Sequence, residues 1–434
     1  MKNQAFKFFY KLHIYVGLFV AVHFIVLALS GSLLLFKDEV ESLTSSAPVT
    51  AVATSETSAL SVGTLMTQVI EQHPGERPLA VFADEEHEGI WNVRLGINDS
   101  KMFRGARKLS FDAVTGKSFD LEGQKSSFME WTLNLHREFF MGSWGKIYVG
   151  IIGLLYVFVM ISGFVIYGRF GKKLAFAEIR YKSPRHLLSD LHRFVGMVVF
   201  AWGLIIGTTG FFLGISSTLI KVYQYQELKE LNAQYAGQQV VHSAPKLAAV
   251  LDQVIATAQK ALPQSKLDYI AFPDTQFSPP NHFLVLMVGT TPMTEKLNQL
   301  VVVDAATGLQ SEVRELPWYL KIALISEPLH FGNYGGLFLK VSWLGFSLLS
   351  LLLPIFGLMI YWKRKKQRAS ATSVSTATLS IGRSPLMKSS YAVPVLLLAV
   401  IATLIVAAFV VGGNFAKIIG VALFVPVLVA RLVV

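Results

Sequence analysis

Long apolar runs alternate with polar segments along the 434-residue chain, and this alternation predicts an integral membrane protein. A helix needs about 20 apolar residues to cross the hydrocarbon core of a bilayer. Six runs reach that length, at residues 14–36, 145–168, 194–216, 337–362, 391–411 and 415–434. The first run is longer than the apolar core of an ordinary signal peptide, so we expect it to be a retained membrane anchor.

Two polar segments between these runs, residues 37–134 and 217–328, have similar patterns. Each begins with helical spacing of apolar residues that ends at a proline, and short strand-like runs follow. The expected helices cover residues 61–72 and 246–262, and the expected strands cover residues 79–82, 90–95, 108–111, 267–271, 282–288 and 300–303. Both segments then read Asp-Ala-x-Thr-Gly, a turn sequence, at Asp112 and at Asp304. We therefore predict one small α+β domain in each segment.

The approaches to the second and fourth spans repeat each other. The sequence LHREFFMGSWGK aligns without a gap with LHFGNYGGLFLK, so that His136 and His330 are 194 residues apart. The apolar runs that follow keep the register, because Tyr167 and Tyr361 are also 194 residues apart. A repeat that spans helix, domain and helix indicates an internal duplication.

Leu-His doublets also stand before the first and third spans. His13 is followed after 18 residues by Gly31, and His192 after 18 residues by Gly210, each within a Ser/Thr-Gly pair. We predict a membrane all-α core with α+β insertions, in which a duplicated helix–domain–helix unit forms a four-helix bundle about an axis along the membrane normal. The predicted parts are span one (1–36), domain one (37–134), an approach with span two (135–168), a basic loop (169–193), span three (194–216), domain two (217–328), an approach with span four (329–362), a linker (363–390) and a hairpin of two spans (391–434).

The net charge of +11 is distributed as membrane topology requires. Basic residues gather before span one, between spans two and three, and after span four: Lys2, Lys7, Lys11, Arg169, Lys172, Lys173, Arg180, Lys182, Arg185, Lys363, Arg364, Lys365, Lys366 and Arg368. Because positive loops stay in the cytoplasm, we expect a cytoplasmic N-terminus and two domains on the outer side. The same distribution argues against a nucleic-acid partner.

The chain contains no cysteine. This excludes disulfides, iron–sulfur clusters, cysteine-ligated zinc and haem attached covalently through a Cys-x-x-Cys-His motif. Any haem in this protein would have to be b-type and held by side chains such as histidine.

The order and duplication of these motifs resemble the PepSY-associated transmembrane family over residues 1 to about 368. The resemblance rests on the Leu-His starts, the Ser/Thr-Gly pairs, the Gly-x-x-Ile-Tyr exits of spans two and four, and the Asp-Ala-x-Thr-Gly turns. It implies PepSY-like domains facing the periplasm of a bacterial inner membrane. The family includes iron-regulated reductases that act on ferric siderophores and carry b-type haems. The C-terminal hairpin departs from the family pattern.

Four histidines at equivalent repeat positions are the expected haem ligands. A pseudo-twofold axis brings equivalent positions to opposite sides of a bundle, and imidazole is a good ligand for haem iron. We therefore expect His13 to share one haem with His192, and His136 to share a second with His330. An interfacial or helix-capping histidine is the alternative at each position.

Other residues near these positions carry weaker expectations. His23 lies inside span one and is a rival ligand, although Trp202 occupies its repeat position. Arg137 and Arg193 follow the expected ligands and are candidates to pair with haem propionates. Glycines in the spans indicate either close helix packing or room for a macrocycle. His73, His87, His242 and His282 are expected on domain surfaces, and His186 in a solvated loop.

These features favour transmembrane electron transfer through two b-type haems to a ferric siderophore outside the membrane. The chain has no Gly-x-Gly-x-x-Gly fingerprint, so a separate quinol or flavoprotein would have to donate the electrons. One alternative is a haem-free PepSY membrane protein that binds or regulates a partner protein. The other is a transporter subunit, which the near absence of Asp and Glu from the spans disfavours.

Overall fold

The computed structural model of the chain describes residues 2–44, 60–84, 89–119, 127–170, 178–181, 183–236, 244–291, 294–297 and 299–374. These residues divide into two compact units. The helical unit comprises Met1–Glu39, Thr132–Phe211 and Leu329–Val434, and the sheet unit comprises Val40–Trp131 and Phe212–Pro328. The predicted spans at 391–411 and 415–434 lie outside the described residues.

Four helical stretches in the described part of the chain are long and apolar enough to cross a membrane: Phe6–Leu34, Gly142–Gly168, Phe200–Gln234 and Asn333–Lys365. Each overlaps one of the first four predicted spans, and the third extends past its predicted end at residue 216 to Gln234. The chain is therefore a multi-pass membrane protein with a mainly helical core.

The helices of the bundle begin and end as follows: α1 (Lys2–Leu34), α5 (Gly142–Phe170), α6 (Pro184–Val198), α7 (Phe200–Tyr223), α12 (Gly336–Ser350) and α13 (Leu352–Val374). Two short helices, α4 (Ser127–Glu138) and α11 (Trp318–Phe331), precede α5 and α12, and η4 (Asn333–Gly335) follows α11. The break between α12 and α13 lies just before Pro354, which lacks the N–H that would continue the helical ladder.

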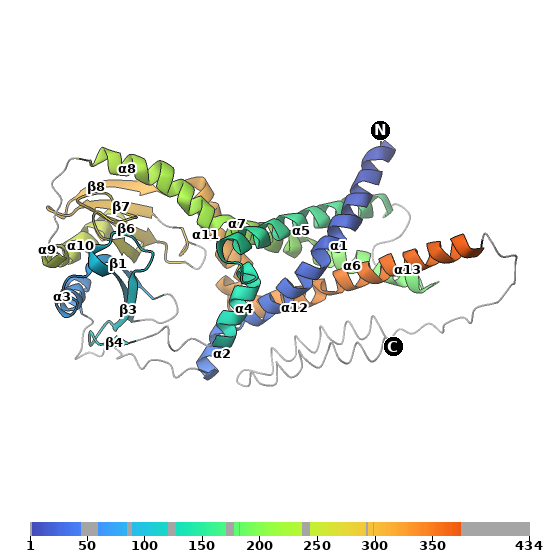
Figure 1. Cartoon of the computed structure of the whole chain (residues 1–434), viewed down its shortest axis with the longest axis horizontal. Helices are drawn as coiled ribbons and strands as arrows, with labels where there is room; N and C mark the ends of the chain where they lie inside the picture. Colours follow the sequence, from blue (N-terminus) through green and yellow to red (C-terminus); the bar gives the residue numbers. More distant parts are fainter. Residues whose placement is uncertain are drawn as a thin grey trace. The chain divides into compact units, whose positions relative to one another are not determined.

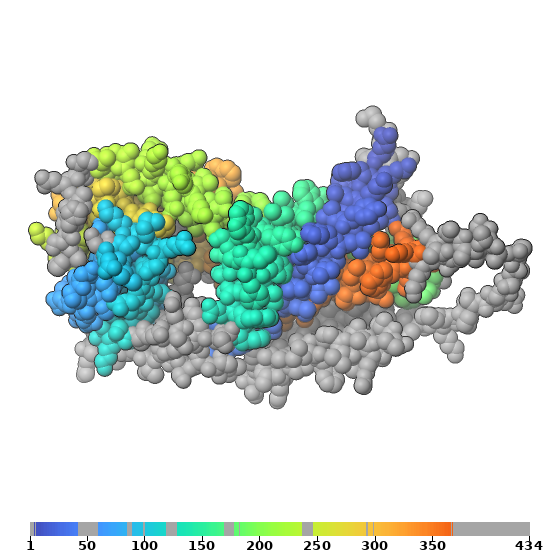
Figure 2. Space-filling view, in the orientation of Figure 1, coloured from blue at the N-terminus to red at the C-terminus, as the bar shows by residue number. Residues whose placement is uncertain are grey.

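Inside the helical unit, α1 packs against α5, α12 and α13, and α6 packs against α13 (Figure 1). Figure 2 shows the blue side chains of α1 lying beside the orange side chains of α13. The buried core between these helices holds two stacked aromatic pairs. The rings of Phe24 and Tyr156 lie 4.6 Å apart, and those of Trp202 and Phe346 lie 6.1 Å apart, centroid to centroid.

The sheet unit contains one antiparallel sheet with the strand order β4-β3-β2-β1-β5-β6-β7-β8. Its strands are β1 (Arg77–Ala83), β2 (Ile90–Gly96), β3 (Arg107–Asp112), β4 (Ser118–Phe119), β5 (Lys266–Ala271), β6 (His282–Val288), β7 (Gln299–Asp304) and β8 (Gln310–Glu315). The six strands expected from the sequence are present. The sequence did not predict β4 and β8.

The two polar segments contribute strands to the same sheet. They join where β1 pairs with β5, with Val81 opposite Ile270 and flanking pairs on either side. A register irregularity lies near the start of both strands, between Pro78 and Ala80 in β1 and between Leu267 and Tyr269 in β5. Strands from segments almost 200 residues apart are thus held together by main-chain hydrogen bonds.

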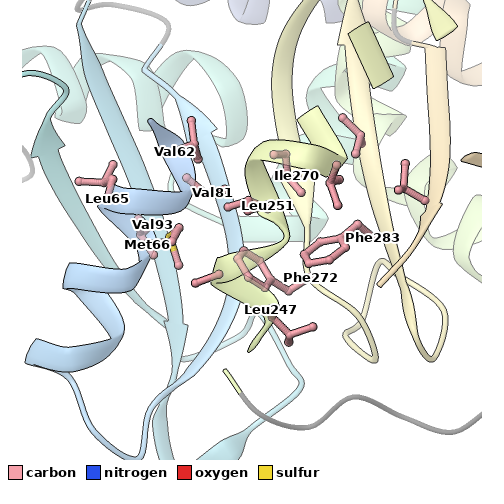
Figure 3. Packing of buried hydrophobic residues seen from close by; sticks show 14 of the residues in the cluster. Val62, Leu65, Met66, Val81, Val93, Leu247, Leu251, Ile270, Phe272 and Phe283 are labelled. Carbon is pink, nitrogen blue, oxygen red and sulfur yellow. The ribbon is translucent and has the colours of Figure 1, made fainter. Parts of the chain in front are cut away.

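One face of the sheet is covered by α3 (Val62–Gln72), α9 (Ala244–Ala249) and α10 (Leu251–Ala261). Val62, Leu65 and Met66 of α3 share a buried cluster with Leu247 of α9, Leu251 of α10 and the strand residues Val81, Val93 and Ile270 (Figure 3). On the opposite face, residues of β5 to β7 pack against Leu228 of η3 (Gln224–Leu228) and Leu231 of α8 (Lys229–Gln234). Tyr235 just after α8, Leu316 just before α11 and Leu320 in α11 belong to the same cluster. In Figure 1 the green helix α8 lies beside β6 to β8.

The predicted Asp-Ala-x-Thr-Gly turns have the same geometry in both segments. Asp112 Oδ1 accepts hydrogen bonds from the backbone N–H of Val114 and Thr115 and from the Thr115 hydroxyl. Asp304 does the same with the three corresponding groups of its own turn. Each turn closes on a glycine with positive φ, 68° at Gly116 and 66° at Gly308, a conformation that favours glycine. The remaining short elements are α2 (Lys37–Thr44) and η1 (Ile97–Asp99).

One histidine expected on a surface is buried instead. His282 is 1% exposed, and its ring lies 3.9 Å from the ring of Tyr235, centroid to centroid. Its nitrogens make hydrogen bonds with the Pro280 carbonyl and the Ser311 hydroxyl. The strand beginning at His282 was expected, but the expectation of surface exposure was wrong, because Tyr235 packs over the His282 ring and the sequence pattern does not show that long-range contact.

Candidate cofactor site: two pairs of facing histidines

Both predicted histidine pairs are brought together in the helical unit. His13 of α1 faces His192 of α6, with ring centroids 6.1 Å apart. His136 of α4 faces His330 of α11, with ring centroids 6.3 Å apart. We call these the inner pair and the outer pair, following the predicted topology.

The Nδ1 atoms of the inner pair are tied to carbonyl oxygens. His13 Nδ1 lies 3.1 Å from the Val159 carbonyl of α5 and 3.1 Å from the Ser162 hydroxyl. His192 Nδ1 lies 3.1 Å from the Leu353 carbonyl of α13. A carbonyl oxygen can only accept, so each Nδ1 carries the proton and each Nε2 keeps its lone pair.

The Nδ1 atoms of the outer pair are tied to hydroxyls. His136 Nδ1 lies 3.0 Å from Ser30 Oγ of α1, and His330 Nδ1 lies 2.9 Å from Thr209 Oγ1 of α7. The single proton of each hydroxyl is donated one turn back along its own helix, at 2.7 Å in both cases. Each hydroxyl therefore accepts from Nδ1–H, which gives the outer pair the same tautomer as the inner pair.

The Nε2 atoms of all four histidines make no hydrogen bond to any residue that the structure describes. Burial lowers the pKa of His136 and of His192 to about 4, and that of His330 to about 3. At neutral pH these imidazoles are uncharged, and a neutral imidazole with a free Nε2 is a metal ligand.

A glycine lies beside each imidazole ring, and three of the four glycines make room for it. A Cβ built on the glycine would approach the Cε1 atom of the ring at the following distances: Gly31 to His136, 2.8 Å; Gly163 to His13, 3.0 Å; Gly210 to His330, 3.2 Å; Gly357 to His192, 3.8 Å. By contrast, Gly17 and Gly196 face the aliphatic side chains of Val159 and Leu353 at ordinary contact distances. The first three glycines therefore admit an imidazole ring where any side chain would press on it.

The separation of each pair would let both imidazoles bind one metal. Two metal–nitrogen bonds of about 2 Å, together with the half-widths of two imidazole rings, span a centroid separation of this size. No group of three or more His, Asp or Glu side chains gathers within the described ranges, so each pair supplies two ligands only. A metal whose remaining ligands come from a macrocycle, as in b-type haem, fits these residues.

The two pairs lie at different depths of the bundle. Along α1, His13 marks the level of the inner pair and Ser30 that of the outer pair, which is 17 residues further on. At about 1.5 Å per residue, the two levels are about 25 Å apart along the helix. That separation is close to the thickness of a bilayer core, about 30 Å.

The weaker candidates lie outside this arrangement. Both nitrogens of His23 are occupied, Nδ1 by the Phe19 carbonyl at 2.9 Å and Nε2 by the Tyr148 hydroxyl at 2.7 Å. Arg193 donates to the Glu178 carbonyl, lies 3.7 Å from the Asp190 carboxylate and stacks over the ring of Tyr167.

Arg137 is half-exposed and donates to the side chain of Asn134. His186 is exposed at the start of α6, and His73 bonds Arg107 in the sheet unit. His87 and His242 lie outside the described residues.

Sequence reasoning missed the residues that orient the ligands. Ser30, Thr209 and Ser162 each precede one of the glycines that face a histidine, so the signal was the Ser/Thr-Gly pair itself. Its partner could not be identified from the sequence, because the hydrogen bonds join helices more than 100 residues apart. The Val159 and Leu353 carbonyls leave no mark in a sequence.

Comparison with known families gives one match. A family model described as "PepSY-associated TM region" matches residues 10–364. The matched range includes all four paired histidines and both domain segments. No curated protein matches the chain significantly.

Proposed function

The chain belongs to the PepSY-associated transmembrane family, and from that membership we propose that it is a transmembrane electron-transfer protein holding two b-type haems. The observation that carries this proposal is the pairing of four histidines, each with Nδ1 hydrogen-bonded and Nε2 without a hydrogen bond to a described residue, at two levels of one helical bundle. Bis-histidine sites of this kind are built in bundle cores.

The side chains have distinct roles in this proposal. His13 and His192 hold one haem, and His136 and His330 hold the other. The Val159 and Leu353 carbonyls and the Ser30 and Thr209 hydroxyls fix the rings and increase the basicity of Nε2. The apolar core around Phe24 and Tyr156 excludes water between the two levels. Bound haem supplies one-electron transfer, and the chain tunes it.

We further propose that the chain is a duplicated helix–domain–helix unit with a cytoplasmic N-terminus in a bacterial inner membrane. The matched turns at Asp112 and Asp304 and the matched anchors Ser30 and Thr209 support the duplication. The basic residues around the start of α6 and in the second half of α13 support this orientation, in which the sheet unit would face the periplasm.

The proposed acceptor is a ferric siderophore, as the family resemblance implies. Hard oxygen ligands hold Fe²⁺ less tightly than Fe³⁺, so one electron would release the iron outside the membrane. A separate quinol or flavoprotein would donate the electron, since no flavin or nicotinamide fingerprint occurs in the sequence.

The first experiment tests the ligands. Purified protein should show the absorption spectrum of low-spin b-type haem, with two haems per chain. His13→Ala and His192→Ala should lose the same haem, and His136→Ala and His330→Ala the other. His23→Ala is the matched control and should keep both haems. A colourless protein, or loss of one haem in both His13→Ala and His136→Ala, would contradict the proposal.

The second experiment tests the acceptor. Chemically reduced protein should be reoxidised by a ferric siderophore under anaerobic conditions. His330→Ala should abolish this reaction while the inner haem stays reducible. If ferric siderophores of every class leave the reoxidation rate of the two-haem protein unchanged, the acceptor is not a ferric chelate.

A further inference from the structure

The two halves of the sheet differ on the face opposite α3 and α10. In β6 and β7 this face carries apolar residues packed beneath helices: Leu284, Leu286, Leu300 and Val302. Corresponding positions are found by counting back from Asp112 and Asp304 and following the strand pairing, which is the same in both halves. In β2 and β3 these positions carry polar or cationic residues: Asn92, Arg94, Lys108 and Ser110. This face of the sheet is therefore apolar in the half that helices cover, and polar and cationic in β2 and β3.

Two cations stand side by side on this polar half. Arg94 of β2 and Lys108 of β3 are direct cross-strand partners. Like charges in this position repel each other and destabilise a sheet. Neither side chain has an ion pair or hydrogen bond with any residue in the described part of the chain, and both are half-buried. An uncompensated pair of this kind is a natural place for a bound anion.

Two aromatic rings lie next to the cations. Phe82 of β1 and Tyr269 of β5 are stacked, with ring centroids 5.5 Å apart and planes 24° apart. The Arg94 guanidinium lies 5.9 Å and the Lys108 ammonium 6.0 Å from the centre of the Phe82 ring. Burial raises the pKa of Tyr269 although Arg94 opposes this, so its hydroxyl keeps its proton and can donate.

We propose that Phe82, Arg94, Lys108 and Tyr269 bind an anionic metal chelate that carries aromatic rings, and, given the proposed function, that this chelate is a ferric tris-catecholate. Three catecholates around Fe³⁺ leave a net negative charge that meets Arg94 and Lys108. Catechol rings stack on Phe82 and Tyr269 or receive a cation over their faces. Three hydroxamates around Fe³⁺ give a neutral complex without aromatic rings, which these four residues do not favour.

The test measures binding without electron transfer. Gallium(III) replaces iron in a synthetic tricatecholate chelate, because Ga³⁺ has the same charge and is not reduced. Full-length protein in detergent is titrated with this chelate, with a gallium trihydroxamate and with gallium citrate. We expect the tricatecholate to bind more tightly than either of the others, and its affinity to fall as the salt concentration rises.

Substitutions locate the site. Arg94→Gln with Lys108→Gln should weaken tricatecholate binding on the order of tenfold or more, since charge-assisted contacts are the strong ones. Arg94→Leu with Lys108→Leu copies the leucines at the corresponding positions of β6 and β7, so it should fold and should bind equally poorly. Arg107→Gln is the matched control. This substitution removes the charge of the residue that precedes Lys108 in β3, whose side chain bonds Glu76. The Arg107→Gln protein should bind the tricatecholate as tightly as the unaltered protein.

The results separate this inference from the proposed function. Haem content and gallium binding are measured independently, so a haem-free protein would overturn the function and leave the binding result intact. Unchanged tricatecholate affinity in both double variants, or equal affinity for the three gallium complexes, would overturn the binding site even in a protein that holds two haems.

Discussion

The acceptors that hold the imidazole rings differ between the two pairs. At the inner pair they include main-chain carbonyls, Val159 and Leu353, which no side-chain substitution can remove. At the outer pair they include the hydroxyls of Ser30 and Thr209, beside the main-chain carbonyls of Leu27 and Ile206. Exchanging Ser30 and Thr209 therefore removes the side-chain part of the hydrogen bonding at the outer pair and leaves its main-chain part.

Ser30→Ala with Thr209→Val should weaken haem retention at the outer pair by about tenfold and raise its midpoint potential. An Nδ1–H without a strong acceptor makes Nε2 a poorer donor to ferric iron, and such partners are commonly worth about 10–100-fold in metal affinity. A spectroscopic redox titration measures both effects. Ser32→Ala is the control, because Ser32 bonds Ser347 on another side of α1. If the midpoint potential of the outer haem is the same in the altered and unaltered proteins, the Ser30 and Thr209 hydroxyls do not tune it.

Gly31→Ala should displace the His136 ring, since the new methyl group would lie 2.8 Å from Cε1. We expect loss of most of the outer haem with the inner haem retained, as judged by pyridine haemochrome content and spectra. Gly17→Ala in the same helix is the control, because its nearest neighbour is a Val159 methyl group at 3.8 Å. An outer haem that survives Gly31→Ala would show that the ring can move without losing its ligand position.

The pairing of the histidines could be predicted because it follows from equal spacing in a repeat. The tautomer could not, since it depends on which atoms of Val159, Ser30 and Thr209 reach the rings across helices. The glycines left two interpretations open, helix packing or macrocycle space. The structure adds a third: Gly31, Gly163 and Gly210 leave room for the imidazoles themselves.

Helix α6 begins ten residues earlier than the span expected there, at Pro184 instead of residue 194. The Ser183 side chain caps it by accepting a hydrogen bond from the His186 N–H, and a proline is favoured at the first helical position. Hydrophobicity alone set the predicted boundary, so the polar first turns were assigned to a loop. The polar strand β8 was missed for the same reason, since its alternating exposed residues lack an apolar signature.

The buried carboxylate of Asp190 links α6 by hydrogen bonds to Arg180 in the segment before the helix. Asp190 is 1% exposed and accepts three hydrogen bonds from Arg180, two from the guanidinium and one from the backbone N–H. Burial alone would raise the pKa of Asp190, but these hydrogen bonds and the charges of Arg180 and Arg193 lower it below its usual value. The carboxylate therefore stabilises the folded protein above about pH 4.

Asp190→Asn should reduce stability at pH 7 by about 1–3 kcal/mol, because it leaves Arg180 without its charge partner. Since the folded-state pKa is lowered, this contribution is present above the unfolded-state pKa and disappears as the pH falls through the folded-state value. Thermal unfolding in detergent across a pH series measures it. Glu71→Gln, an exposed change in α3, is the control. A stability difference that stays constant down to pH 3 would exclude the charged interaction as its source.

The whole chain was predicted to contain two separate α+β segments, and their elements are present in the expected order. The sequence did not show that the segments share a sheet. That arrangement depends on the pairing of β1 with β5. The apolar pattern of each strand is equally compatible with pairing inside its own segment and with pairing between the two segments. Long-range pairing of two similar strands leaves no periodic signal.

The proposed orientation in the membrane can be tested on the whole molecule. A reporter that is active only outside the cytoplasm should work when fused near Ser100 or Gln276, and a cytoplasmic reporter should work near Ala175. The alternation of basic loops is the physical reason. Activity of a cytoplasmic reporter at Ser100 would invert the topology and exchange the inner and outer pairs.

The pairing of Val81 with Ile270 has a consequence for how such a chain can arise. Each of these two residues is the fifth of its strand. The flanking pairs are reciprocal, because Ala80 lies opposite Ala271 and Phe82 lies opposite Tyr269, as in a self-complementary contact between identical subunits. Under the duplication proposed above, an ancestral single-copy protein would dimerise through its β1 edge, and fusion of two gene copies would keep that contact. Either half alone exposes that edge, so two separately encoded halves should reassemble as a heterodimer.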